Sequence, residues 1–281
     1  MPRWFVTGAG GQLANAFARV LEGDVFLSRE ETLDIRDAEA VRTAVHEFAP
    51  DCVLHCAAYT NVDGAEADED TAEAINVLGT RNVVQAVRGT HTTVVYFSTD
   101  YVFDGAKGAP YLETDRPNPL NAYGRTKLGG EQEILGWIRG IVIRTSWLFS
   151  ETGHNFVKTI LAAARERDGT GEPLRVVDDQ IGSPTYAGHL AAAVDEAIRA
   201  GLPPGLYHMA GSGYGSWCEL AREVVQLAGL DVEVEPITTA EAGRPATRPL
   251  FSALDSERPI PRLPHWADGV AEAVDRLIPL G

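Results

Sequence analysis

A short apolar run, a cluster of glycines and a helical pattern follow one another in the first 21 residues. The pattern predicts a strand at residues 4–6 and a helix at residues 12–21, and Gly8, Gly10 and Gly11 lie between them. Such a turn lets backbone N–H groups approach a phosphate, whose charge the helix N-terminus stabilises. The sequence therefore predicts a dinucleotide-binding site, with a purely structural turn as the alternative.

Apolar runs and helical patterns keep alternating after this turn. We predict further strands at residues 25–27, 52–56, 93–98 and 140–145, and helices at residues 38–48, 71–87 and 122–137. This alternation is typical of parallel strands joined by crossover helices, and near-continuous apolar runs indicate strands buried on both faces. We expect an α/β fold, a Rossmann-like doubly wound parallel sheet of five strands with a smaller C-terminal α/β substrate-binding domain.

The alternation is less regular after residue 150. We predict helices at residues 156–167, 186–200 and 216–227 and one ending near residue 278, with short strands at residues 175–177 and 206–209. A second, smaller unit beside the sheet is the simplest account. We therefore predict a dinucleotide-binding Rossmann domain at residues 1–149, to which later segments return, and a mainly substrate-binding domain at residues 150–281.

The chain is strongly acidic, with 40 acidic and 24 basic residues and a formal charge of −16. Nucleic acids and anionic membranes bind surfaces rich in Lys and Arg, so we expect neither as a partner. An anionic ligand of this chain must be held locally, by helix N-termini and a few basic side chains.

Three cysteines, Cys52, Cys56 and Cys218, are too few and too badly spaced for a disulfide framework. Core packing is favoured over metal ligation for them, and we expect no metal site. No stretch reaches the roughly 18 apolar residues of a membrane span. We expect a cytoplasmic protein.

The end of the predicted second strand indicates which dinucleotide is bound. NAD-specific sites usually place an acid there, on the ribose 2′-OH. Here Ser28 and Arg29 occupy this place, and a hydroxyl with a guanidinium suits a 2′-phosphate. The sequence predicts a preference for NADPH. NADH is the alternative, if Arg29 is only a surface charge and Glu30 turns toward the ribose.

Tyr123 and Lys127 are four residues apart on a predicted helix, so they share one face. A cation one turn away favours the phenolate and lowers a tyrosine pKa that is ordinarily near 10. Thr99 ends the predicted fourth strand, at the sheet edge where ligands of such folds bind. We predict these three residues to be catalytic, with an ordinary helix pair and a capping threonine as the alternatives.

Longer motifs give the chain a family resemblance. The sequence reads Ser-Thr-Asp-Tyr at residues 98–101, Tyr-Gly-Arg-Thr-Lys at residues 123–127, Arg-Thr-Ser-Trp at residues 144–147 and Asp-Gln-Ile-Gly-Ser-Pro-Thr at residues 179–185. These motifs are similar to those of the dTDP-4-dehydrorhamnose reductase family, a branch of the extended short-chain dehydrogenases/reductases. The turn Gly8-x-x-Gly11-x-x-Ala14 resembles the glycine motif of the extended family, with a small alanine as its last member.

The resemblance implies NADPH-dependent reduction of the C4 ketone of a dTDP-4-keto-6-deoxyhexose, giving dTDP-L-rhamnose. Tyr123 would protonate the developing alkoxide, Lys127 would hold the nicotinamide ribose, and Thr99 would hydrogen-bond near the ketone. By the same matching, Asp100 and Trp147 would contact the sugar. The remaining cofactor contacts implied are those of Gly8, Gly11, Gln12, Leu13, Asp34, Ile35, Ala57, Ala58 and Tyr59.

Other reactions of the extended family fit less well. Sugar-nucleotide 4,6-dehydratases carry a second acid after the Thr-Asp pair, and here Tyr101 takes its place. Epimerases hold NAD tightly, which Ser28 and Arg29 disfavour. Arg244 and Arg248, in a proline-rich loop, are candidates for gripping the substrate diphosphate.

Two alternatives stay open. Other NDP-4-ketohexose reductases, from antibiotic deoxysugar pathways, share these motifs and differ in the face of the ketone that accepts hydride. The regulatory subunit of methionine adenosyltransferase also resembles this branch, and it works as a binding partner rather than an enzyme. Some family members need Mg2+, and the chain is expected to be a monomer or a homodimer.

Overall fold

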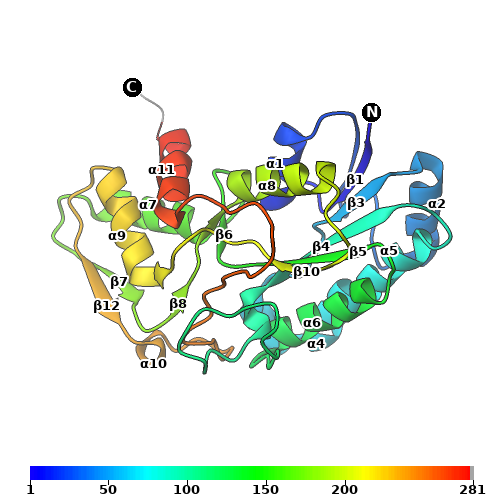
Figure 1. Ribbon diagram of the computed structural model, residues 1–281. Helices are drawn as coiled ribbons and strands as arrows, with labels where there is room; N and C mark the ends of the chain where they lie inside the picture. Colours follow the sequence, from blue (N-terminus) through cyan, green and yellow to red (C-terminus); the bar gives the residue numbers. More distant parts are fainter. Residues whose placement is uncertain (279–281) are drawn as a thin grey trace.

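The computed structural model describes residues 1–278. Its centre is a parallel sheet with the strand order β10-β5-β4-β3-β1-β2 (Figure 1). The strands are β1 (Arg3–Thr7), β2 (Asp24–Ser28), β3 (Cys52–His55), β4 (Thr93–Thr99), β5 (Gly140–Thr145) and β10 (Gly205–His208). β4 and β5 end together, with Thr99 opposite Thr145. The predicted α/β class with a Rossmann-like parallel sheet is confirmed.

The sheet has six strands where the sequence predicted five. The additional strand, β10, comes from the C-terminal half and pairs with β5, with His208 opposite Arg144. A strand was predicted near this place, but a four-residue apolar run does not reveal its pairing partner. The division at residues 149 and 150 stays a prediction, and residues 279–281 of its second domain lie outside the described part of the chain.

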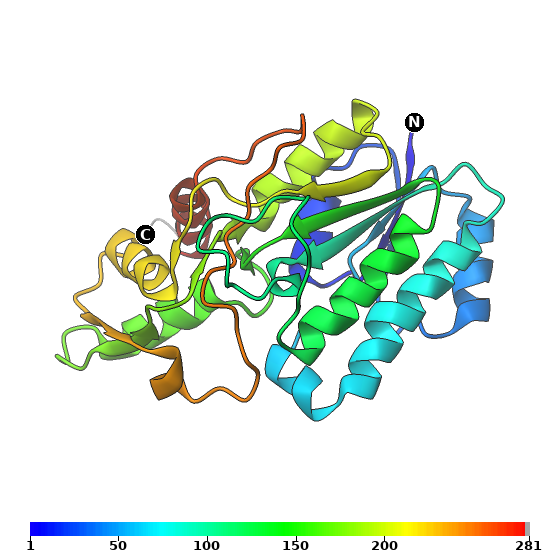
Figure 2. The same cartoon turned by 60° about the horizontal axis from the view of Figure 1, so that its bottom comes forward.

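Helices cover both faces of the sheet (Figure 2). Side chains of a strand alternate between the faces, so Val6 packs toward one layer of helices and Phe5 toward the other. The first layer consists of α1 (Gln12–Val20) and α8 (Ala187–Arg199), and the second of α2 (Ala38–Phe48), α5 (Thr80–Ala86) and α6 (Ala122–Leu135). Asp37 caps α2, since its carboxylate accepts hydrogen bonds from the N–H groups of Glu39 and Ala40.

The helix predicted at residues 71–87 contains a wide turn. It runs through α4 (Glu69–Glu73), the π-helix η1 (Ala74–Gly79) and α5, and the short α3 (Val62–Ala67) precedes it. Within the π-helix, the Asn76 side chain bonds the backbone N–H and C=O of Tyr59, at 2.9 and 3.1 Å, and the Thr126 hydroxyl, at 3.0 Å. The wide turn thus ties the loop after β3 to α6.

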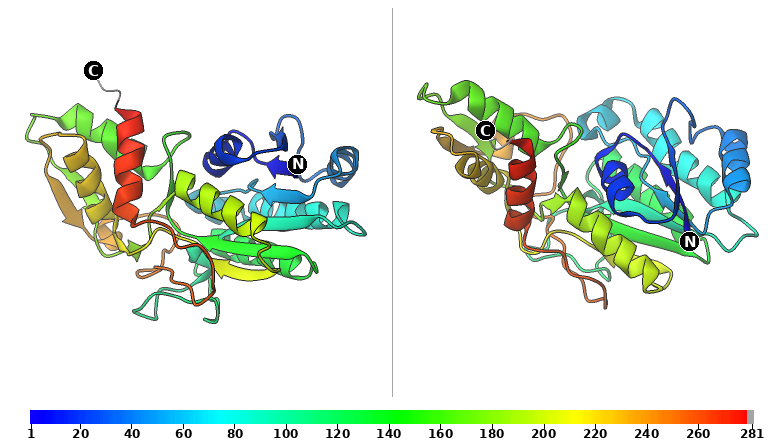
Figure 3. Two further views of the ribbon diagram at one scale, coloured as in Figure 1. Left: turned by 45° about the horizontal axis from the view of Figure 1, so that its top comes forward. Right: turned by 90° about the horizontal axis from the view of Figure 1, so that it is seen from above.

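The C-terminal half adds a smaller group of helices and strands beside the sheet (Figure 3). It has its own core, formed by residues such as Leu161 of α7, Val224 of α9 and Val270 of α11. Its elements are β6 (Leu148–Phe149), α7 (Phe156–Arg167), β7 (Leu174–Val177), β8 (Ile181–Gly182), β9 (Thr185–Tyr186), β11 (Gly215–Ser216), α9 (Trp217–Leu227), β12 (Val234–Ile237), α10 (Thr239–Ala242) and α11 (Trp266–Leu277). In residues 1–278, none of the helices combines the length and apolar character that crossing a bilayer requires.

Candidate active site

A cavity of about 570 Å³ lies at the carboxyl edge of the sheet, where the glycine turn after β1 faces the ends of β4 and β5. Open α/β sheets bind their ligands outside this edge. The cavity brings together residues from five separate segments that the sequence singled out. They are Gly8, Gly11, Gln12, Leu13, Ala57, Ala58, Thr99, Asp100, Tyr123, Lys127 and Trp147.

The backbone of the glycine turn lies very close to the backbone of the loop after β3. Gly8 has a φ of +74°, and a Cβ at this position would lie 2.7 Å from the backbone nitrogen of Ala57. Gly11 is the N-cap of α1 and makes no side-chain capping bond. The first N–H groups of α1 therefore keep their capacity to bind an anion, and the residues present fit a dinucleotide pyrophosphate.

A second cavity of about 250 Å³ adjoins the first and shares Gly8, Ala57 and Ala58 with it. It is also lined by Asp34 and Ile35, two of the predicted cofactor residues. The Asp34 carboxylate pairs with Arg36 at 2.6 Å, and this contact lowers its pKa. Because the cavities share one wall, a single elongated ligand can occupy both.

Three predicted cofactor residues, Ser28, Arg29 and Tyr59, lie outside these two linings. Ser28 differs from the expectation, because its hydroxyl is buried and donates to the Val6 carbonyl at 3.4 Å. It is the last residue of β2, and its side chain points into the packed interior rather than toward a ribose. Arg29 is exposed, so the prediction of a 2′-phosphate contact rests on Arg29 alone.

Tyr123 is positioned by the start of α6. The Asn121 side chain caps this helix by accepting from the Gly124 N–H at 2.8 Å. A Cβ on Gly124 would lie 2.2 Å from the Tyr101 carbonyl oxygen, so glycine allows the helix to pack directly on the short helix η2 (Asp100–Val102) after β4. This packing brings Tyr123 beside Thr99.

The pKa of Tyr123 is governed by burial and not by Lys127. Burial raises the Tyr123 pKa, and the neighbouring Thr99 side chain opposes that rise. The spacing of the two residues on one helix predicted that Lys127 would lower this pKa. In the structure, the Lys127 ammonium instead lies 4.0 Å from the ring centroid of Tyr96.

Lys127 is itself buried, at 2% exposure. Burial lowers the pKa of Lys127 to about 7, and the negative charge of Glu131 opposes this effect. Glu131 forms a buried ion pair with Arg144 at 2.6 Å and accepts a hydrogen bond from the Ser98 hydroxyl at 2.5 Å. Glu131 was not among the predicted site residues, although its position one turn after Lys127 on α6 was a usable signal.

Both carboxylate oxygens of Asp100 accept hydrogen bonds. Thr99 donates to Oδ1 at 3.1 Å, and Ser252, from the proline-rich loop, donates to Oδ2 at 2.5 Å. Burial raises the pKa of Asp100 to about 6, and these hydrogen bonds oppose the rise.

This raised pKa predicts how stability depends on pH. The folded chain keeps the Asp100 proton up to about pH 6, whereas the unfolded chain releases it near its ordinary value of 3.8. The contribution of Asp100 to stability is therefore fully present below pH 3.8 and is lost as the pH rises through about 6, by about 3 kcal/mol. We expect the free energy of unfolding of Asp100→Asn, measured in urea, not to fall in this way. The stability of the variant relative to the unmodified protein should therefore increase as the pH rises. A stability difference that is constant with pH would contradict this assignment.

Trp147 sits in an uncommon backbone conformation, with a φ of +47°. Its ring stacks on that of Trp217, a residue of the cavity wall that the sequence analysis missed. Thr145, at the end of β5, also lines the cavity and was also missed. Among the described residues, neither Trp147 Nε1 nor Thr145 Oγ1 has a hydrogen-bond partner, although both atoms are buried.

Arg244 and Arg248 lie outside the catalytic cavity, beside a groove of about 640 Å³. Arg248 is largely buried and pairs with Asp63 at 3.0 Å. Arg244 lies 3.9 Å from the same carboxylate and is 66% exposed. Of the two, Arg244 has the guanidinium that is accessible to a diphosphate.

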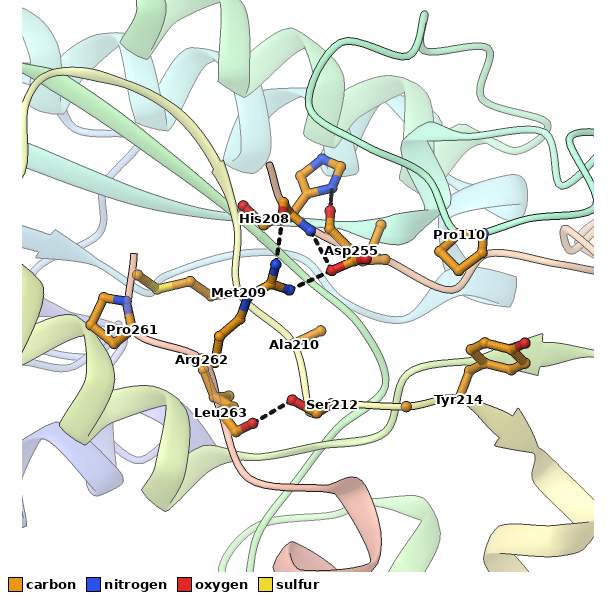
Figure 4. Close-up of a pocket in the computed structure, with 14 residues that line it drawn as sticks. Pro110, His208, Met209, Ala210, Ser212, Tyr214, Asp255, Pro261, Arg262 and Leu263 are labelled. Atoms are coloured by element: carbon orange, nitrogen blue, oxygen red, sulfur yellow. Dashed lines mark hydrogen bonds and ion pairs between the residues drawn. The ribbon is translucent and has the colours of Figure 1, made fainter. Parts of the chain in front are cut away.

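A smaller cavity of about 170 Å³ lies elsewhere, between the loop after β10 and residues 254–263 (Figure 4). Its polar groups bond one another: Ser212 donates to the Leu263 carbonyl at 2.5 Å, and Arg262 pairs with Asp255. None of the predicted site residues lines it. Residues 1–278 contain no group of three or more His, Cys, Asp or Glu side chains that could hold a metal ion.

Known proteins resemble the chain over nearly its full length. The family model for the RmlD substrate binding domain matches residues 3–278. A dTDP-4-dehydrorhamnose reductase of Streptomyces griseus is 39% identical, covering 98% of this chain and 94% of the relative. A dTDP-4-keto-6-deoxy-D-glucose reductase of Streptomyces niveus is 34% identical, covering 96% of each. The crystal structure of a dTDP-4-dehydrorhamnose reductase from Bacillus anthracis, in complex with NADP, is similar with a TM-score of 0.93 and 37% identity, covering 98% of this chain and 99% of that one.

Proposed function

Because the chain belongs to the family of the RmlD substrate binding domain, we propose that it uses NADPH to reduce the C4 ketone of a dTDP-4-keto-6-deoxyhexose. It is an NADP-dependent oxidoreductase of the dTDP-4-dehydrorhamnose reductase type, and its product is dTDP-L-rhamnose. One observation carries the proposal. Thr99, Tyr123 and Lys127 line the same cavity as the glycine turn, so proton donor and dinucleotide meet in one space.

In this proposal, each residue of the cavity has a separate role in the reaction. NADPH, when bound, supplies the hydride that C4 of the sugar accepts, and it is oxidised to NADP+. Tyr123 gives its phenolic proton to the ketone oxygen, so that the carbonyl becomes an alcohol. Thr99, which lines the same cavity, holds the phenol in place for that transfer, and the buried Lys127 binds the nicotinamide ribose.

Reduction fits the site better than elimination of water. A dehydratase needs a second acid beside Asp100, and Tyr101 occupies that position. Tyr101 lines the catalytic cavity, and burial raises the pKa of its phenol, so it does not act as a base near neutral pH. A ketone can therefore be reduced here without loss of water from the sugar.

A direct assay separates the proposal from its alternatives. We expect purified protein to oxidise NADPH when dTDP-4-keto-L-rhamnose is added, at a rate well above that with dTDP-4-keto-6-deoxy-D-glucose. The opposite preference would favour a reductase of another deoxysugar pathway, like the Streptomyces niveus relative. No oxidation with either sugar, together with co-purification of a methionine adenosyltransferase, would favour the regulatory subunit.

Cofactor preference gives a test at a single exposed residue. We expect Arg29→Ala to raise the KM for NADPH roughly tenfold, because a charge-assisted contact to the 2′-phosphate is lost. The KM for NADH should stay nearly unchanged, since NADH lacks that phosphate. Steady-state kinetics with both cofactors measure the effect, and Arg88→Ala, an exposed arginine after α5, serves as the control. An equal change for both cofactors would contradict the role of Arg29.

We further infer a cytoplasmic protein that works as a monomer or a homodimer. Its three cysteines are all free thiols, which supports a reducing compartment. Cys52 and Cys218 are buried in the cores of the two halves, as packing residues. The number of chains in the assembly stays a prediction.

A further inference from the structure

Two indole rings stack in the wall of the catalytic cavity. The ring centroids of Trp147 and Trp217 lie 3.5 Å apart, and the rings are tilted by only 5°. Trp147 follows β5 of the central sheet, whereas Trp217 is the first residue of α9 in the C-terminal half. The stack therefore joins the two halves of the molecule beside the place where Tyr123 and Thr99 face the cavity.

Trp147 depends on its surroundings for its orientation. A left-handed backbone is uncommon for an aromatic residue and persists only where neighbouring groups hold it. Gly182 leaves room for the ring, because a Cβ there would lie 2.3 Å from its Cε2 atom. Trp217 covers one face of the ring, so the direction of the Trp147 indole is set by both neighbours.

Trp217 is itself firmly anchored. Its Nε1–H donates to the Gln180 side chain at 3.1 Å, and Gln180 in turn donates to Thr239 at 2.9 Å. The Phe156 ring lies 4.6 Å from the Trp217 ring. Ser216, just before it, forms a capping box with Glu219 that fixes the start of α9. Trp217 is thus a rigid support against which a second ring can be held.

We propose that Trp217 is a positioning residue for sugar recognition, holding the Trp147 indole in the orientation in which it contacts the hexose of the substrate. This inference rests on the proposed function. The C–H groups and the C6 methyl of a 6-deoxyhexose are apolar and pack well on an aromatic ring. A ring that is already fixed loses less conformational freedom when the sugar binds, which strengthens binding.

The test compares three substitutions. Trp217→Leu removes the supporting ring, and Trp217→Phe keeps a smaller one. Trp266→Phe is the matched control, because Trp266 also begins a helix of the C-terminal half, α11, but does not line the catalytic cavity. We expect Trp217→Leu to raise the KM for the dTDP-sugar roughly threefold to tenfold, Trp217→Phe to raise it less, and the control to leave it unchanged. The KM for NADPH should stay constant in all three.

A spectroscopic readout reports on the stack itself. Closely stacked indoles whose transition dipoles are inclined to one another give a paired band of opposite signs in far-ultraviolet circular dichroism. We expect the unmodified protein and Trp266→Phe to show it, and Trp217→Leu to have lost it. If Trp217→Leu does not fold, Trp217→Phe carries the test, with the band lost and the sugar KM raised.

Two results would overturn the role of Trp217. They are an unchanged sugar KM in a folded Trp217→Leu or Trp217→Phe variant, and an equal rise in the KM values for sugar and NADPH. Failure of the proposed function is a separate result, since the unmodified protein would then not turn over the dTDP-sugar. In that case, the affinities of unmodified protein and variants for dTDP-L-rhamnose, measured by calorimetry, give the same comparison.

Discussion

Replacing Tyr123 by Phe is expected to lower kcat for ketone reduction by roughly 100- to 10,000-fold, the usual contribution of a positioned proton donor. The substitution removes only the phenolic hydroxyl. The ring can keep its edge-to-face contact with Tyr101, whose centroid lies 5.9 Å away. NADPH binding should therefore persist while proton transfer to the developing alkoxide is lost.

The measurement pairs a single-turnover rate with a fluorescence titration of NADPH. Tyr111→Phe is the matched control, since Tyr111 is another buried tyrosine, whose hydroxyl donates to Asp104 at 2.8 Å, outside the catalytic cavity. We expect this control to keep its turnover. Undiminished turnover by Tyr123→Phe would end the claim that Tyr123 is the proton donor.

Arg144→Met is expected to have the largest effect on stability. Arg144 and Glu131 form an ion pair in which both side chains are at most 3% exposed. Removing the arginine leaves the Glu131 carboxylate buried with the Ser98 hydroxyl as its remaining hydrogen-bond donor. Breaking such a pair typically costs about 3–5 kcal/mol, because an uncompensated charge stays in the interior. Urea unfolding at neutral pH measures the loss.

Two further variants test whether the loss of stability comes from the buried charge of Glu131 or from the loss of a contact alone. The double substitution Arg144→Met with Glu131→Leu removes both charges, and we expect it to regain most of the lost stability. Arg125→Met, on the same helix as Glu131, breaks the exposed pair with Glu69 and should cost about 1 kcal/mol or less. A double variant as unstable as the single one would contradict the account of the buried pair.

Much of the fold could be predicted because its signals are local. The helix at residues 38–48 follows a capping aspartate and ends before Pro50, and its bounds agree with those of α2. The strand at residues 140–145 contains the apolar, β-branched run Ile141-Val142-Ile143, and its bounds agree with those of β5. Local signals did not place β10 beside β5, because that pairing joins segments more than 60 residues apart in the chain. They also did not predict the π-helix, which depends on the contacts of Asn76 with Tyr59 and Thr126.

The candidate site likewise contains residues that local signals identify and residues that they do not. The glycine turn and the Tyr123–Lys127 pair have characteristic spacings, and they line one cavity in the structure. Ser28 was placed by its position after β2, but the direction of its side chain depends on how the strand end packs. Trp217 has no local signal, because its contact with Trp147 joins the two halves of the chain. Burial, which sets the pKa values of Tyr123 and Lys127, is likewise a property of the whole fold.

The central claim is that this cavity transfers hydride to C4 of a dTDP-linked keto sugar. The most direct measurement uses NADPH that carries deuterium at the transferred position of the nicotinamide, with dTDP-4-keto-L-rhamnose as substrate and NMR of the product. The account predicts dTDP-L-rhamnose with one deuterium at C4, formed in equal amount to the NADPH consumed. A product with hydrogen at C4, or consumption of NADPH without a reduced sugar, would contradict it.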